Sequence, residues 1–93
     1  MDKIRIESTS YILVENDKNG YDDSIFKEKW TEYFEPFDYI LGDWSYGKLR
    51  LKGFYKSNHN HVKPYNDIQT YKDYLKKECA YGCRYFLLEK QSN

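Results

Sequence analysis

One run near the middle of the chain constrains the fold more than any other segment. Residues 39–55 read YILGDWSYGKLRLKGFY. An apolar run ends at Gly42-Asp43-Trp44, a short turn follows through residues 45–47, and cationic residues then alternate with Leu and Gly. Because side chains two apart on a strand share a face, this alternation predicts a β-hairpin with one aliphatic face and one cationic face. We place its strands at about residues 38–43 and 48–55.

The remaining sequence predicts three further strands and two helices. Strands are expected at residues 3–7, 11–14 and 83–89, and loops at residues 16–20 and 56–66. A first helix begins at Asp22, Asp23 or Ser24 and runs to about Phe34, with Pro36 as its terminator. A second helix covers residues 67–80. The order ββαββαβ predicts an α+β fold, a mostly antiparallel sheet with two helices, in a single domain over residues 1–93.

Aromatic residues at helical spacing predict how the first helix packs. The stripe consists of Phe26, Trp30, Tyr33, Phe34 and Phe37. We expect it to cover the sheet through Tyr39, Leu41 and Phe86. On the second helix the apolar stripe consists of Ile68, Tyr71, Leu75 and Cys79, and Gly82 is placed to close the helix.

The charges balance overall but not along the chain. The chain contains fifteen Lys and Arg residues and fifteen Asp and Glu residues, so its net charge favours neither nucleic acid nor membrane as a partner. Residues 1–47 carry an excess of anions and residues 48–93 an excess of cations, and whether the two parts neutralise each other in space is left open. The polar start of the chain and the lack of a long apolar run predict a cytoplasmic protein that does not span a membrane.

The hairpin over residues 42–56 carries the candidate binding surface. Lys48, Arg50 and Lys52 are expected to point one way, with aromatic residues nearby, which is the combination that binds phosphates and stacks on bases. A solvated strand face that discourages edge aggregation is the alternative interpretation. The candidate binding residues are Asp43, Trp44, Tyr46, Lys48, Arg50, Lys52, Phe54 and Tyr55.

Asp43 has three interpretations. It could accept backbone hydrogen bonds across the turn, or pair with Arg50 across the hairpin. A catalytic role would need a second titratable group, and Asp38 is the near one on the same hairpin. Catalysis is the least favoured of the three, and we assign no catalytic residue.

Two His and two Cys residues match a zinc site only in number. His59 and His61 lie in a polar loop, whereas Cys79 lies on a buried helix stripe, and the spacing of Cys79 and Cys83 is unlike that of compact zinc knuckles. We expect free thiols, no metal and no cofactor, with a Cys79–Cys83 disulfide as an alternative.

The hairpin also resembles a known family. The sequence is similar to the YutD-like family of small bacterial (Gram-positive) proteins at Asp38-Tyr39-Ile40, Gly42-Asp43-Trp44, Tyr46-Gly47 and Leu49-Arg50-Leu51-Lys52-Gly53-Phe54. Glu78-Cys79, Tyr81-Gly82-Cys83 and Tyr85-Phe86 resemble its C-terminal pattern. Ser45 departs from the expected Gly. The resemblance implies an α+β fold and a bacterial cytoplasmic setting, and it brings no established activity.

Together these observations predict a non-enzymatic binding module. The first hypothesis is contact with RNA or DNA through the basic, aromatic hairpin. The alternative is a protein–protein adaptor that presents the same surface to an acidic partner protein. The sequence leaves the oligomeric state undetermined.

Overall fold

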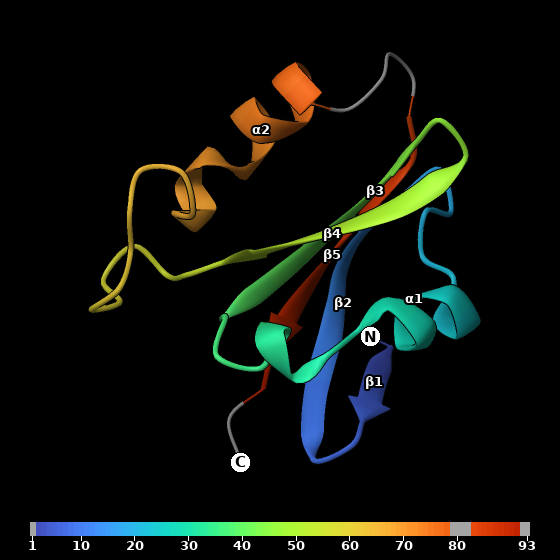
Figure 1. Cartoon of the computed structure of the whole chain (residues 1–93), viewed down its shortest axis with the longest axis horizontal. Coiled ribbons are helices and arrows are strands. Elements are labelled where there is room, and N and C mark those ends of the chain that lie inside the picture. Colours follow the sequence, from blue (N-terminus) through green and yellow to red (C-terminus); the bar gives the residue numbers. More distant parts are fainter. Residues whose placement is uncertain (1, 79–82, 92–93) are drawn as a thin grey trace.

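A single antiparallel sheet organises the molecule (Figure 1). The computed structural model describes residues 2–78 and 83–91. Its elements are β1 (Lys3–Ile6), β2 (Thr9–Asp17), α1 (Asp23–Lys29), the 3-10 helix η1 (Glu32–Phe34), β3 (Tyr39–Ser45), β4 (Lys48–Phe54), the 3-10 helix η2 (Ile68–Thr70), α2 (Tyr71–Glu78) and β5 (Tyr85–Lys90). Within these residues, five strands and two α-helices follow the order ββαββαβ. The predicted α+β fold is confirmed.

The last strand of the chain lies at the centre of the sheet. The strand order is β1-β2-β5-β3-β4, and β5 pairs antiparallel with both β2 and β3. Phe86, Leu87 and Leu88 are all buried, because a central strand is covered on both faces. β1 and β4 are therefore the two edges of the sheet.

One face of the sheet packs against α1. Phe26 and Trp30 join Ile40, Leu49 and Phe86 in this core, together with residues from β1 and β2. The aromatic rings meet edge to face, with the Phe26 and Phe86 centroids 6.1 Å apart. Phe26 and Trp30 thus pack on Phe86 as predicted.

The opposite face packs against α2. Leu41, Phe54 and Leu87 are buried there, and Tyr39, Tyr74 and Leu75 pack against them. The expectation that the first helix covers Tyr39 and Leu41 is therefore wrong. Neighbouring residues of a strand face opposite sides, so Tyr39 and Leu41 cannot share a face with Ile40.

The first helix is shorter than predicted. The Asp22 side chain accepts a hydrogen bond from the Ile25 amide and caps the helix, but α1 ends at Lys29 rather than Phe34. Trp30 is already extended, with φ −67° and ψ 138°. This bend lets its buried indole donate a hydrogen bond to the Tyr11 hydroxyl at 3.0 Å. Pro36 follows η1 and does not end α1.

Smaller differences concern the ends of elements. The central turn holds only Tyr46 and Gly47, both at positive φ, so Ser45 belongs to β3. β2 extends over 9–17 rather than 11–14, because β5 pairs along most of it. Asp67 caps η2 by accepting from the Gln69 amide, and α2 follows directly. The predicted helix end at Gly82 lies outside the described residues.

No helix in the described part of the chain is both long and apolar enough to cross a bilayer.

Candidate binding groove at the edge of β4

Asp43 and Arg50 form a pair across the hairpin. The Arg50 Nε and Nη2 atoms donate to the two carboxylate oxygens of Asp43 at 3.1 and 2.7 Å, and Asp43 is only 1% exposed. Nη2 also donates to the Glu78 carbonyl at 2.6 Å. The hydrogen bond with Asp43 raises the pKa of Arg50 above its ordinary value. The cross-strand alternative for Asp43 is confirmed, and the charge of Arg50 is compensated inside the fold.

Asp38 lies too far from Asp43 to form a catalytic dyad with it. Five residue steps of extended chain separate them, which corresponds to about 17 Å. The Asp38 carboxylate instead accepts a hydrogen bond from the Lys56 amide at 2.8 Å. Asp38 therefore fixes the chain just beyond β4.

Lys52 projects among aromatic rings. Its Nζ lies 5.2 Å from the ring centroid of Phe54, 5.4 Å from that of Tyr74 and 5.9 Å from that of Tyr65. Burial lowers the pKa of Lys52 below its ordinary value. The expected alternation along β4 is confirmed, since Leu49 and Leu51 pack in the opposite core. However, α2 covers part of the cationic face, because Phe54 shares that face and needs burial.

Three further predicted residues lie in two other places. Trp44 lies on the α1 face, where its indole donates to the Gly20 carbonyl at 2.6 Å and Arg84 stacks 4.5 Å above its ring. Tyr46 is 94% exposed at the tip of the turn, beside the exposed Lys48. The predicted residues therefore do not form one continuous surface.

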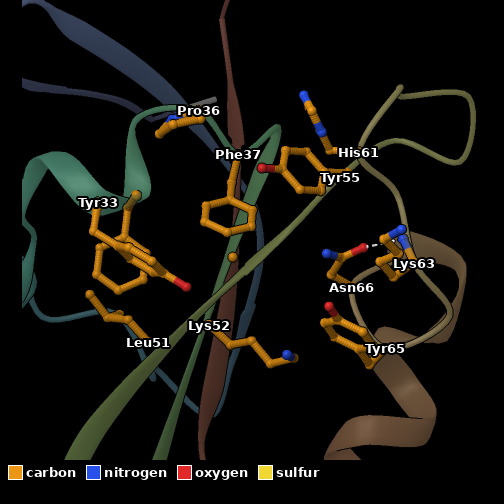
Figure 2. Close-up of a pocket in the computed structure, with 12 residues that line it drawn as sticks. Tyr33, Pro36, Phe37, Leu51, Lys52, Tyr55, His61, Lys63, Tyr65 and Asn66 are labelled. Carbon is orange, nitrogen blue, oxygen red and sulfur yellow. Dashed lines mark hydrogen bonds between the residues drawn. The ribbon is translucent and has the colours of Figure 1, made fainter.

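A groove of about 600 Å³ lies across the outer edge of β4. β4 contributes Leu51, Lys52 and Gly53, and Tyr55 follows directly after it. One wall consists of Tyr33, Phe34, Pro36 and Phe37. The other wall consists of His61, Lys63, Tyr65 and Asn66. Figure 2 shows β4 passing between Tyr33 and Phe37 on one side and Tyr65 and Lys63 on the other.

The walls are held by ring packing and by local turns. Phe37 lies against Gly53, where an added Cβ would come within 2.3 Å of its ring. Tyr55 contacts Phe37 at 4.6 Å between centroids and stacks on His59 at 4.1 Å. The Lys63 amide donates to the Asn66 side chain at 2.6 Å, which closes the loop of the second wall.

The groove combines exposed aromatic side chains with positive charge. Tyr33 and Tyr65 are each 69% exposed, and both lie in the groove. Lys52 and Lys63 supply ammonium groups, whereas none of the twelve described lining residues carries a carboxylate. Such a surface suits an acidic, partly apolar ligand.

Lys52 and Tyr55 are the predicted binding residues that line this groove. Tyr33, Phe37, His61, Lys63 and Tyr65 also line it but were not among the predicted binding residues. The sequence feature that could have indicated this wall is Tyr65 after Pro64, because a large ring is unusual in an otherwise polar loop.

The His and Cys residues show no metal-binding arrangement in the described part of the chain. His59 accepts a hydrogen bond at Nδ1 from the His61 amide at 2.9 Å, and no group of three metal-ligating side chains is found among the described residues. Cys83 is disulfide-bonded, which contradicts the expectation of a free thiol at this position. Cys79 lies outside the described residues.

Three comparisons relate the chain to known proteins. A family model described as "Putative antitoxin YutD-like" matches residues 5–89. The chain is 37% identical over 87 residues to "Putative antitoxin YutD" of Bacillus subtilis strain 168, a match that covers 94% of this chain and 96% of the relative. The solution NMR structure of the B. subtilis protein yutD superposes with a TM-score of 0.84 at 34% identity, covering 100% of this chain and 84% of that one. The resemblance inferred from the hairpin is confirmed.

Proposed function

Because the chain belongs to the YutD-like family, we propose that it binds a partner protein through the groove at the edge of β4. The family description and the B. subtilis relative both carry the words "putative antitoxin". By analogy, the partner is a toxin protein, and binding of this chain inhibits its activity. We place this binding in the bacterial cytoplasm and assign the chain no catalytic role.

The observation that carries the proposal is the exposure of two tyrosines in a groove that lacks acidic groups. Tyr33 and Tyr65 keep 69% of their surface accessible on opposite walls. Tyrosine is enriched at protein interfaces because one ring buries a large area at low entropic cost. Lys52 and Lys63, which line the same groove, favour a partner with negative charge.

The geometry favours a protein over RNA or DNA. Arg50, one of the predicted phosphate-binding residues, is held by the buried carboxylate of Asp43. Trp44 and Lys52, two further candidates, lie on opposite faces of the sheet. A nucleic acid would need these cations and rings in one row, but they lie on separate parts of the surface. Binding of nucleic acid is the competing hypothesis, and nuclease treatment distinguishes it from binding of a protein.

Co-purification from the host, with and without nuclease, tests the proposal. A protein partner stays bound after nuclease treatment, whereas a nucleic acid is lost together with any protein that it tethers. Tyr65→Ala should release the partner, and Tyr46→Ala is the matched control because Tyr46 is an exposed tyrosine outside the groove. Complete loss on nuclease treatment, or equal retention by both variants, would contradict the proposal.

A further inference from the structure

The outer edge of β4 is open along the groove. β4 ends the strand order, so only one of its edges is paired. With a two-residue turn, Ser45 and Lys48 form the closing hydrogen-bonded pair, and hydrogen-bonded pairs alternate from there. Leu49, Leu51 and Gly53 therefore direct their backbone groups away from β3. Among the described residues, these three make no backbone hydrogen bond outside the sheet.

The open stretch ends where the chain pairs with itself. The Tyr55 amide donates to the Asn66 carbonyl at 2.7 Å, and the Tyr55 carbonyl accepts from the Ile68 amide at 2.9 Å. This short parallel contact covers the edge beyond β4. Among the described residues, the outward backbone groups of residues 49–53 thus have no backbone hydrogen-bond partner, and residues 51–53 line the groove.

We propose that an extended segment of the partner adds to the sheet along β4, with an acidic side chain flanked by two apolar side chains. This inference rests on the proposed function and adds the mode of binding and the chemistry of the bound segment. Strand addition supplies affinity through main-chain hydrogen bonds, and the alternate side chains supply specificity.

The alternation follows from the two sides of β4. Residues of the added strand opposite Leu51 and Gly53 point toward the wall of Tyr33 and Phe37, which is aromatic. The residue between them points toward Lys52 and Tyr65. Within the described residues no carboxylate forms an ion pair with Lys52, so its ammonium group can pair with an incoming Asp or Glu, although Asp73 and Glu78 line the neighbouring pocket.

A phage-displayed library of random twelve-residue peptides, selected on the folded chain, supplies the probe. The selected peptides should carry Asp or Glu between apolar residues. In their presence the amides of Leu51 and Gly53 should gain protection from hydrogen exchange by NMR, whereas the amides of Arg50 and Lys52 are already paired. N-methylation of peptide residues facing β4 should weaken binding at least about tenfold, and N-methylation of their neighbours should not.

A charge variant tests the acidic position. Lys52→Gln should weaken an acidic peptide about fivefold and leave its Asn or Gln analogue unchanged. Lys48→Gln is the matched control, because Lys48 lies on the same face of β4 outside the groove. Equal effects of the two variants would overturn the acidic assignment.

Three results would overturn strand addition. Peptides that need Tyr65 but leave the Leu51 and Gly53 amides exchanging freely would reject this mode and leave the proposed function standing. Concentration-dependent protection of these amides without peptide would show that a second copy occupies the edge. Failure to select any peptide whose binding is sensitive to Tyr65→Ala would also reject strand addition. The proposed function is tested independently, by whether a partner is retained after nuclease treatment.

Discussion

Arg50 holds the buried carboxylate of Asp43 with two hydrogen bonds across neighbouring strands. The pair lies directly in register, and Nη2 reaches on to the Glu78 carbonyl at the end of α2. One guanidinium thus links both strands of the central hairpin to the second helix. It also joins the acidic first part of the sequence to the basic second part, as the Lys90–Glu35 contact at 3.8 Å does.

Arg50→Ala should therefore destabilise the fold. Removing the guanidinium leaves a buried carboxylate without its partner, which costs about 3–5 kcal/mol for a fully buried pair. Arg50 is partly exposed, so we expect about 2 kcal/mol by urea denaturation. Lys48→Ala is the control and should change stability by less than about 0.5 kcal/mol. Equal midpoints for the two variants would show that the pair contributes nothing.

Trp30 and Tyr11 should behave as a coupled pair in the core. Trp30→Ala removes a buried ring and should cost about 3–5 kcal/mol. Tyr11→Phe leaves the buried indole N–H unpaired and should cost about 1–3 kcal/mol. A double-mutant cycle with Trp30→Phe and Tyr11→Phe should give a non-zero coupling energy. Strict additivity of the two changes would contradict the hydrogen bond.

Two glycines should differ in their tolerance of a methyl group. A Cβ at Gly42 would lie 2.2 Å from the Phe86 ring, which is fully buried, whereas a Cβ at Gly53 would lie 2.3 Å from the Phe37 ring at the groove wall. Gly42→Ala should cost about 3 kcal/mol, and Gly53→Ala less, because Phe37 can move outward. Thermal denaturation compares them, and a larger loss from Gly53→Ala would contradict this packing.

The ammonium of Lys52 should titrate below its ordinary pKa in the free chain. Burial disfavours the charged form, so the folded state binds fewer protons than the unfolded state between the lowered pKa and 10.5. Stability attributable to this group therefore rises with pH through that window. NMR titration of the Lys52 side chain should show the lowered pKa, and an acidic peptide should raise it again. An unchanged pKa on peptide binding would place the peptide elsewhere.

The sequence was sufficient to predict features that depend on local alternation. Lys48 to Phe54 alternate clearly, and positive φ at Tyr46 and Gly47 closes the hairpin in the expected place. The strand predicted at residues 83–89 is also present, as β5 at Tyr85–Lys90. These features follow from side-chain period and turn chemistry alone.

Features that depend on packing between distant segments were not predictable in this way. α1 ends at Lys29, and the extended Trp30 places its indole against Tyr11, a contact that helical periodicity does not reveal. The groove combines residues from the segments 33–37, 51–55 and 61–66, which approach only when Phe37 covers Gly53 and Asn66 pairs with Tyr55. The hairpin supplied Lys52 and Tyr55 to the candidate site, whereas the two walls depend on tertiary structure.

The central claim is that a partner protein binds in the groove at the edge of β4. Isothermal titration of the purified, nuclease-treated partner into Tyr33→Ala, Tyr65→Ala and Tyr46→Ala variants tests it most directly. Both groove variants should raise the dissociation constant at least about tenfold, as loss of an interface tyrosine does. The Tyr46→Ala variant should bind with the affinity of the unmodified chain. Unchanged affinity in both groove variants, with loss in Tyr46→Ala, would move the interface to the hairpin tip and contradict the account.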